Sequence, residues 1–120
     1  MLKVLQRKWG LIMSQLTRKE IDIQIALGAI TNSQELSKHI KKATDPEVLE
    51  WALHHKNTMV RVAAAKNSNT PIGVLISAYI FESALTVVDT IYENIESRKK
   101  EAKNALAIIK DYPQFSLNLK

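Results

Sequence analysis

Residues 44–71 have the sequence TDPEVLEWALHHKNTMVRVAAAKNSNTP and predict two short helices joined by a tight turn. Thr44 comes shortly before Pro46, which suits the first turn of a helix because proline has no amide hydrogen to leave unpaired there. Asn57 is a favoured cap for a second helix, and Thr70 stands before a proline where a third helix begins. Between these starts, apolar residues recur at the spacing of a buried helix face: Val48 or Leu49, Ala52, Leu53, Val60, Ala63 and Ala64.

The same kind of helix start recurs outside this segment. Thr17 and Glu20 have the spacing of a capping box, in which the hydroxyl and the carboxylate satisfy two free amides of the first turn. The remaining boundaries are predicted by Asn32, Ser83, Ser97 and, as a stop, Tyr112-Pro113. No segment shows sustained alternation of apolar and polar residues. The chain is therefore predicted to be all-α, with seven helices too short to be stable without packing on one another.

The predicted helix starts are periodic. They recur at offsets of 27, 26 and 27 residues in the series Thr17, Thr44, Thr70 and Ser97, and Ile25, Ala52, Ala78 and Ala105 follow with the same offsets. Caps and core residues that agree in phase indicate a repeat. We expect one domain, residues 1–120, built as a short α-solenoid of about three two-helix repeats with a period of about 26 (17–96). A C-terminal capping helix (97–112), a tail (113–120) and a possible N-terminal helix or extension (1–13) complete it.

The first 13 residues have their own pattern. Leu2, Leu5, Trp9 and Ile12 follow helical spacing, which predicts an amphipathic helix that either docks on the body or lies on a membrane surface; we favour docking. The basic and apolar residues are interleaved, unlike those of a signal peptide. The longest apolar runs fall far short of the ~20 residues that a membrane span requires.

The segment 44–71 resembles the leucine-rich-repeat variant family, the short HEAT-like α-helical repeats of bacterial proteins. The resemblance is carried by the Pro-Glu-Val-Leu start at Pro46, the Val-Arg-x-Ala-x-Ala helix at Val60 and the Asn-x-Asn-Thr-Pro junction at Asn67. It covers about one repeat, and the neighbouring units are looser copies. The resemblance implies a curved stack of helix pairs that acts as a binding scaffold. Some HEAT-like relatives hold DNA on their concave face, and the small size suits an accessory protein of a bacterium, phage or plasmid.

The composition is that of an ordinary globular protein, with 46% hydrophobic and 24% charged residues. The chain contains no cysteine, which excludes a disulfide framework, a thiol nucleophile and a cysteine-based zinc site, and which suits a reducing cytoplasm. The net charge of +5 favours anionic partners, although a solubilising charge explains it as well.

Few residues are candidates for catalysis or metal binding. The sequence has no phosphate-binding loop, nucleophile elbow or His-Glu-x-x-His helix. His54 and His55 are adjacent, so on a helix they point about 100° apart and cannot hold one ion from one face. Asp89, Glu93 and Glu96 share a helix face, which we interpret as a solvated acidic surface. We predict no enzyme activity, no metal and no cofactor.

The candidate binding residues are mostly basic. Equivalent helices of stacked repeats lie side by side, so lysines on two of them would form a strip that attracts phosphates, or a solvated outer face. The predicted strip consists of Lys38, Lys41, Lys42, Lys56, Arg61 and Lys66. Arg61 is equally suited to a structural ion pair. Trp51 is a candidate hot-spot or base-stacking residue, or else packs between repeats.

These observations together predict a non-catalytic binding module. The first hypothesis is a protein–protein interaction adaptor that uses the surface of stacked helices. The alternative is a nucleic-acid-binding protein that uses the basic strip. Self-association is a further possibility, because the apolar ends of so short an array need covering.

Overall fold

The computed structural model describes residues 16–108, and the seven helices predicted for this range are all present. They are α2 (Arg18–Ala26), α3 (Ser33–Lys42), α4 (Pro46–Leu53), α5 (Thr58–Lys66), α6 (Ile72–Phe81), α7 (Leu85–Ser97) and α8 (Lys99–Ile108). No strand occurs among the described residues, so the prediction of an all-α fold is confirmed for them. The predicted N-terminal helix, the tail and the Tyr112-Pro113 stop lie outside the described residues.

Side-chain caps begin the first four of these helices. The Thr17 hydroxyl accepts a hydrogen bond from the Glu20 amide at 3.2 Å, and the Glu20 carboxylate accepts one from the Thr17 amide, which completes the predicted capping box. Asn32, Asp45 and Asn57 each accept an amide of the next helix at 2.9 Å. Each of these caps satisfies one of the amides that the first turn leaves free.

The starts of α6 and α7 differ from the prediction. Their capping residues, Pro71 and Ala84, offer no side-chain acceptor. Thr70 is fully buried and donates its hydroxyl to the Ala64 carbonyl at 2.6 Å, so it closes the preceding helix instead of opening the next. The predicted cap Ser83 is likewise replaced, because the Glu82 carboxylate accepts the first free amides of the α7 start.

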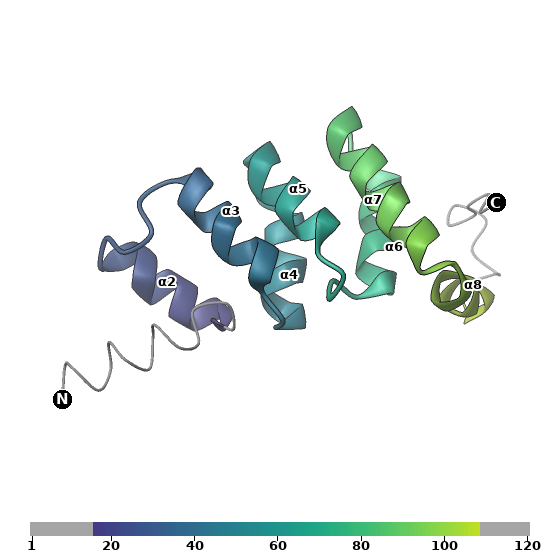
Figure 1. Cartoon of the computed structure of the whole chain (residues 1–120), viewed down its shortest axis with the longest axis horizontal. Coiled ribbons are helices and arrows are strands. Elements are labelled where there is room, and N and C mark those ends of the chain that lie inside the picture. The colour runs from purple at the N-terminus through teal and green to yellow at the C-terminus, as the bar shows by residue number, and fades with distance from the viewer. Residues whose placement is uncertain (1–15, 109–120) are drawn as a thin grey trace.

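The helices form two layers. In the view of Figure 1, α3, α5 and α7 lie side by side, with α3 packed on α5 and α5 packed on α7. Behind them, α4 packs on α5 and α6 packs on α7, while α2 contacts α4. The last helix, α8, packs on α6 and α7. Arg98 anchors its start by donating to the carbonyls of Ser68 (3.0 Å) and Thr70 (2.5 Å).

The core lies between the two layers and is almost entirely aliphatic. The predicted faces of α3, α4 and α5 are buried as expected. On α7 the buried face is shifted from the prediction, because Val87 and Ile91 are buried while Leu85 is 76% exposed. On α2 the buried residues are Ile21 and Gln24, and the expected core residue Ile25 is exposed.

Two buried asparagines fix the register of the front layer. The Asn67 side chain, at the end of α5, donates to the carbonyls of Ile40 (2.9 Å) and Ala43 (2.8 Å) at the end of α3. Twenty-seven residues later, Asn94 of α7 donates to the carbonyls of Ala65 (2.8 Å) and Asn67 (3.0 Å). The last carbonyls of a helix have no partner within it, so these bonds satisfy groups that burial would otherwise leave unpaired.

Candidate functional site

Three turns lie along one edge of the molecule, the upper edge in Figure 1, which we call the turn edge. It consists of residues 27–32, 54–57 and 82–84 and of the helix ends beside them. The three most exposed large apolar residues of the described range lie here: Leu27 (75%), Phe81 (78%) and Leu85 (76%). A single exposed leucine is ordinary, but large apolar side chains gathered on one edge are typical of an interaction surface.

Two of these residues occupy equivalent positions in the fold. Leu27 follows the end of α2, His54 follows the end of α4 and Phe81 ends α6. The three positions are 27 residues apart in the sequence, and all three side chains are exposed. The turn edge therefore presents one side chain from each helix pair in succession.

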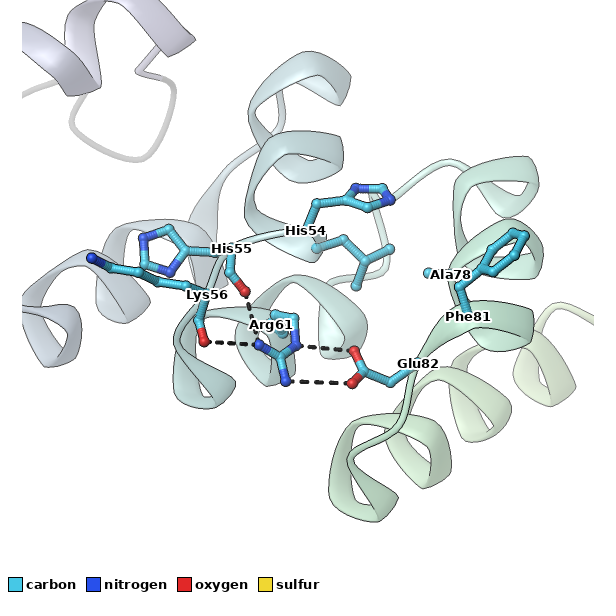
Figure 2. A pocket seen from close by; sticks show the side chains of 8 residues that line it. His54, His55, Lys56, Arg61, Ala78, Phe81 and Glu82 are labelled. Carbon is cyan, nitrogen blue, oxygen red and sulfur yellow. Dashed lines mark hydrogen bonds and ion pairs between the residues drawn. The ribbon is translucent and has the colours of Figure 1, made fainter.

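A cavity of about 240 Å³ opens on the turn edge between the ends of α4 and α6 (Figure 2). Its apolar lining comes from the core residues Leu53 and Ala78 and from the exposed ring of Phe81. Its polar lining comes from the α4–α5 turn, from α5 and from the residue after α6: His54, His55, Lys56, Arg61 and Glu82.

An ion pair between Arg61 and Glu82 forms one wall of this cavity (Figure 2). Arg61 Nε lies 3.0 Å from Glu82 Oε2 and Arg61 Nη2 lies 3.3 Å from Oε1, so the pair is bidentate. The third nitrogen, Nη1, donates to the carbonyls of His55 (2.8 Å) and Lys56 (3.0 Å). All of the guanidinium nitrogens are thus engaged within the chain, and Arg61 joins the α4–α5 turn to the end of α6.

Glu82 is held as a carboxylate. Burial alone would raise its pKa, but hydrogen bonds from the Ala84 amide, from Arg61 and from the Ser83 amide outweigh that effect and leave the pKa below its ordinary value. The same oxygen that receives the two amides begins α7. Glu82 therefore links the cavity wall to the start of the next helix.

Trp51 and His55 are also used within the fold. Trp51 is half-buried against the core, with the Arg18 guanidinium carbon 4.0 Å from its ring centroid and the His55 ring edge-on at 5.3 Å. His55 Nδ1 accepts the Asn57 amide at 3.0 Å. Burial lowers the pKa of His55, and the positive charges of Lys56, Arg61 and Arg18 lower it further. His55 is therefore neutral at pH 7.

The predicted basic residues fall into separate places. Lys38, Lys41 and Lys42 are exposed on α3, and Lys66 is exposed at the end of α5. The bonds from Asn67 hold that end of α5 against the end of α3, which brings Lys66 toward Lys41 and Lys42. Lys56 lies instead in the α4–α5 turn, at the opposite end of α5. With Arg61 paired to Glu82, the four lysines on α3 and at the end of α5 are the part of the predicted strip that stays together.

Sequence reasoning missed two residues of the cavity. Glu82 lies 21 residues from Arg61, and no local pattern connects them. Phe81 had a signal, because its 27-residue spacing from His54 and from Leu27 matches the predicted period.

The predicted acidic face lines a second cavity. This cavity, of about 360 Å³, lies between α6 and α7 and is lined by Tyr79, Val88, Asp89, Tyr92 and Glu93. The two tyrosine rings are 6.1 Å apart. Within residues 16–108, no group of three His, Asp or Glu side chains is placed to hold a metal ion.

Comparisons with known proteins give no match to a family model, to a curated protein or to a solved structure. Among the helices described above, none combines the length and the apolar character that crossing a membrane requires.

Proposed function

We propose that this chain is a non-catalytic protein-binding module, built as a short α-solenoid of three helix pairs closed by α8. The row formed by α3, α5 and α7 and the 27-residue spacing of Asn67 and Asn94 support the repeat. A leucine-rich-repeat variant or HEAT-like array would have this arrangement, and such arrays offer partners an extended surface. The absence of cysteine supports a cytoplasmic location.

The observation that carries the proposal is the apolar turn edge beside the cavity. Phe81 and Leu85 flank one turn and are both more than three-quarters exposed. Fully burying a side chain of this size is worth about 1.5–3 kcal/mol. A micromolar complex requires about 8 kcal/mol, so two such anchors supply a substantial share of it. An aromatic residue next to a cavity is also the usual composition of a binding hot spot.

The test is a pull-down from a lysate of the source organism with tagged full-length chain. We compare the wild type with the double variant Phe81→Ser, Leu85→Ser and with the control Ile23→Ser. Ile23 is also exposed (41%) but lies on α2, outside the cavity. We expect one protein to be enriched by the wild type and the control and lost by the double variant. Circular dichroism checks that all three chains are equally helical.

Two outcomes would oppose the proposal. If the double variant retains every protein that the wild type enriches, the turn edge is not the binding surface. If no protein is enriched but the chain itself changes from dimer to monomer on the double substitution, as measured by sedimentation, the edge serves self-association instead.

A second candidate function, nucleic-acid binding, is favoured by the lysines that α3 and α5 bring together. Lys41, Lys42 and Lys66 are exposed at helix ends that the Asn67 hydrogen bonds hold side by side. Three or four phosphate contacts would give a salt dependence of about −0.9 per contact in the logarithm of the binding constant for duplex DNA. Anisotropy titrations of labelled duplex DNA and single-stranded RNA at two salt concentrations measure it. Unchanged affinity in Lys41→Glu, Lys42→Glu would rule this candidate out.

A further inference from the structure

The cavity between α4 and α6 has the shape and lining for one large apolar side chain. Its volume is about 240 Å³, and Leu53 and Ala78, both at least 94% buried, form its apolar interior. The Phe81 ring stands beside it with most of its surface in water (Figure 2). An apolar side chain placed there would contact the core residues on one side and the Phe81 ring on the other, and would remove both from water.

The charges around the cavity favour an anion beside that side chain. The positive charge of Arg61 is matched by Glu82, its bidentate partner. The carbonyls of His55 and Lys56, which could otherwise attract a cation, already accept hydrogen bonds from Arg61. The exposed ammonium group of Lys56 is therefore the charge of the lining that no opposite charge of the lining compensates.

We propose that the cavity receives a large apolar side chain from an acidic segment of the partner protein, with a neighbouring carboxylate placed against Lys56. This inference rests on the proposed function and specifies its partner. The apolar side chain supplies most of the binding free energy, since it is desolvated on entry. The carboxylate selects among apolar segments and fixes the direction in which the segment lies.

Short peptides test this directly. The full-length chain, labelled with ¹⁵N, is titrated with acetyl-Gly-Asp-Leu-Asp-Gly-amide, with the charge-inverted Lys-Leu-Lys version and with the Asp-Ala-Asp version. We expect the Asp-Leu-Asp peptide to shift the backbone amides of Lys56 and Phe81 in a saturable way. Replacing its leucine by alanine should weaken binding roughly tenfold, as expected for losing the larger part of a buried leucine side chain. Equal binding of the Lys-Leu-Lys peptide would overturn the assignment of an acidic partner.

Matched variants separate the cavity from the rest of the turn edge. Phe81→Ala should weaken the Asp-Leu-Asp peptide roughly tenfold, and Lys56→Gln should weaken it roughly two- to fivefold, with the loss disappearing at high salt. Leu85→Ala is the control, because Leu85 is equally exposed but does not line the cavity. If Leu85→Ala weakens the peptide as much as Phe81→Ala, or if no peptide shifts these amides at millimolar concentration, the inference is wrong. The pull-down would still decide the proposed function independently.

Discussion

Replacing Asn67 by alanine should cost the protein a large part of its stability. The substitution removes hydrogen bonds of 2.9 and 2.8 Å to the carbonyls of Ile40 and Ala43, and Asn67 itself is 6% exposed. The Ile40 carbonyl keeps the Ala43 amide as a partner, whereas Ala43 keeps only a 3.4 Å contact from Asn69. A hydrogen bond contributes about 1 kcal/mol, and a buried group left without one costs about 1–3 kcal/mol. The free energy of unfolding should therefore fall by about 2–4 kcal/mol.

Urea denaturation followed by helical circular dichroism measures this change. Each kcal/mol corresponds to about 4–8 °C for a domain of this size, so thermal unfolding should shift down by roughly 10–25 °C. The control is Asn69→Ala, because Asn69 is exposed and its side chain makes only the weak contact with Ala43. It should cost less than about 0.5 kcal/mol. If Asn67→Ala costs no more than Asn69→Ala, the asparagine bonds do not hold the front layer together.

Three further predictions concern the turn edge and the junction after α5. Arg61→Leu should lower the free energy of unfolding by about 2–4 kcal/mol, because it leaves Glu82 with an uncompensated charge on a side chain that is 8% exposed. The double variant Arg61→Leu, Glu82→Leu should lose less than the sum of the single variants in urea titrations, and strict additivity would show that the pair is not coupled. The pKa of His55 is lowered by burial and by neighbouring positive charges, so the folded chain binds a proton less readily than the unfolded chain. Stability should therefore fall as the pH drops below about 6.5, the ordinary pKa of histidine. His55→Asn should flatten the urea midpoint between about pH 7.5 and 5.5 relative to the wild type, and parallel curves would argue against His55 as the source of the slope. Thr70→Val removes the buried 2.6 Å hydrogen bond to the Ala64 carbonyl at nearly constant volume and should cost about 1 kcal/mol by thermal denaturation; a melting temperature equal to that of the wild type would contradict this.

The helix boundaries could be predicted from the sequence because capping is a local interaction. Thr17, Asn32 and Asn57 accept amides two or three residues away, so the pattern that predicts each cap lies within one turn. Thr70 shows where this reasoning fails. A threonine before a proline has the pattern of a cap, but its hydroxyl has a better acceptor in the preceding helix.

The buried face of α7 and the cavity wall depend on contacts between helices. The sequence of α7 has adjacent apolar pairs, so helical spacing fits a face through Leu85 as well as one through Val87 and Ile91. Packing against α5 and α6 selects the second face, and Leu85 is left in water. The pairing of Arg61 with Glu82 likewise depends on how α5 and α6 are placed, which single-helix patterns do not contain.

The two asparagines have a consequence for how long such a molecule can be. Asn67 donates to the helix before it, while its own carbonyl receives Asn94 from the helix after it. A unit of 27 residues therefore carries both halves of the connection, like a link with a hook and an eye. Copying residues 44–70 in tandem would supply each new unit with a donor for its predecessor and an acceptor for its successor. The chain could then be lengthened one helix pair at a time, and the spacing of side chains along the turn edge would be extended in equal steps.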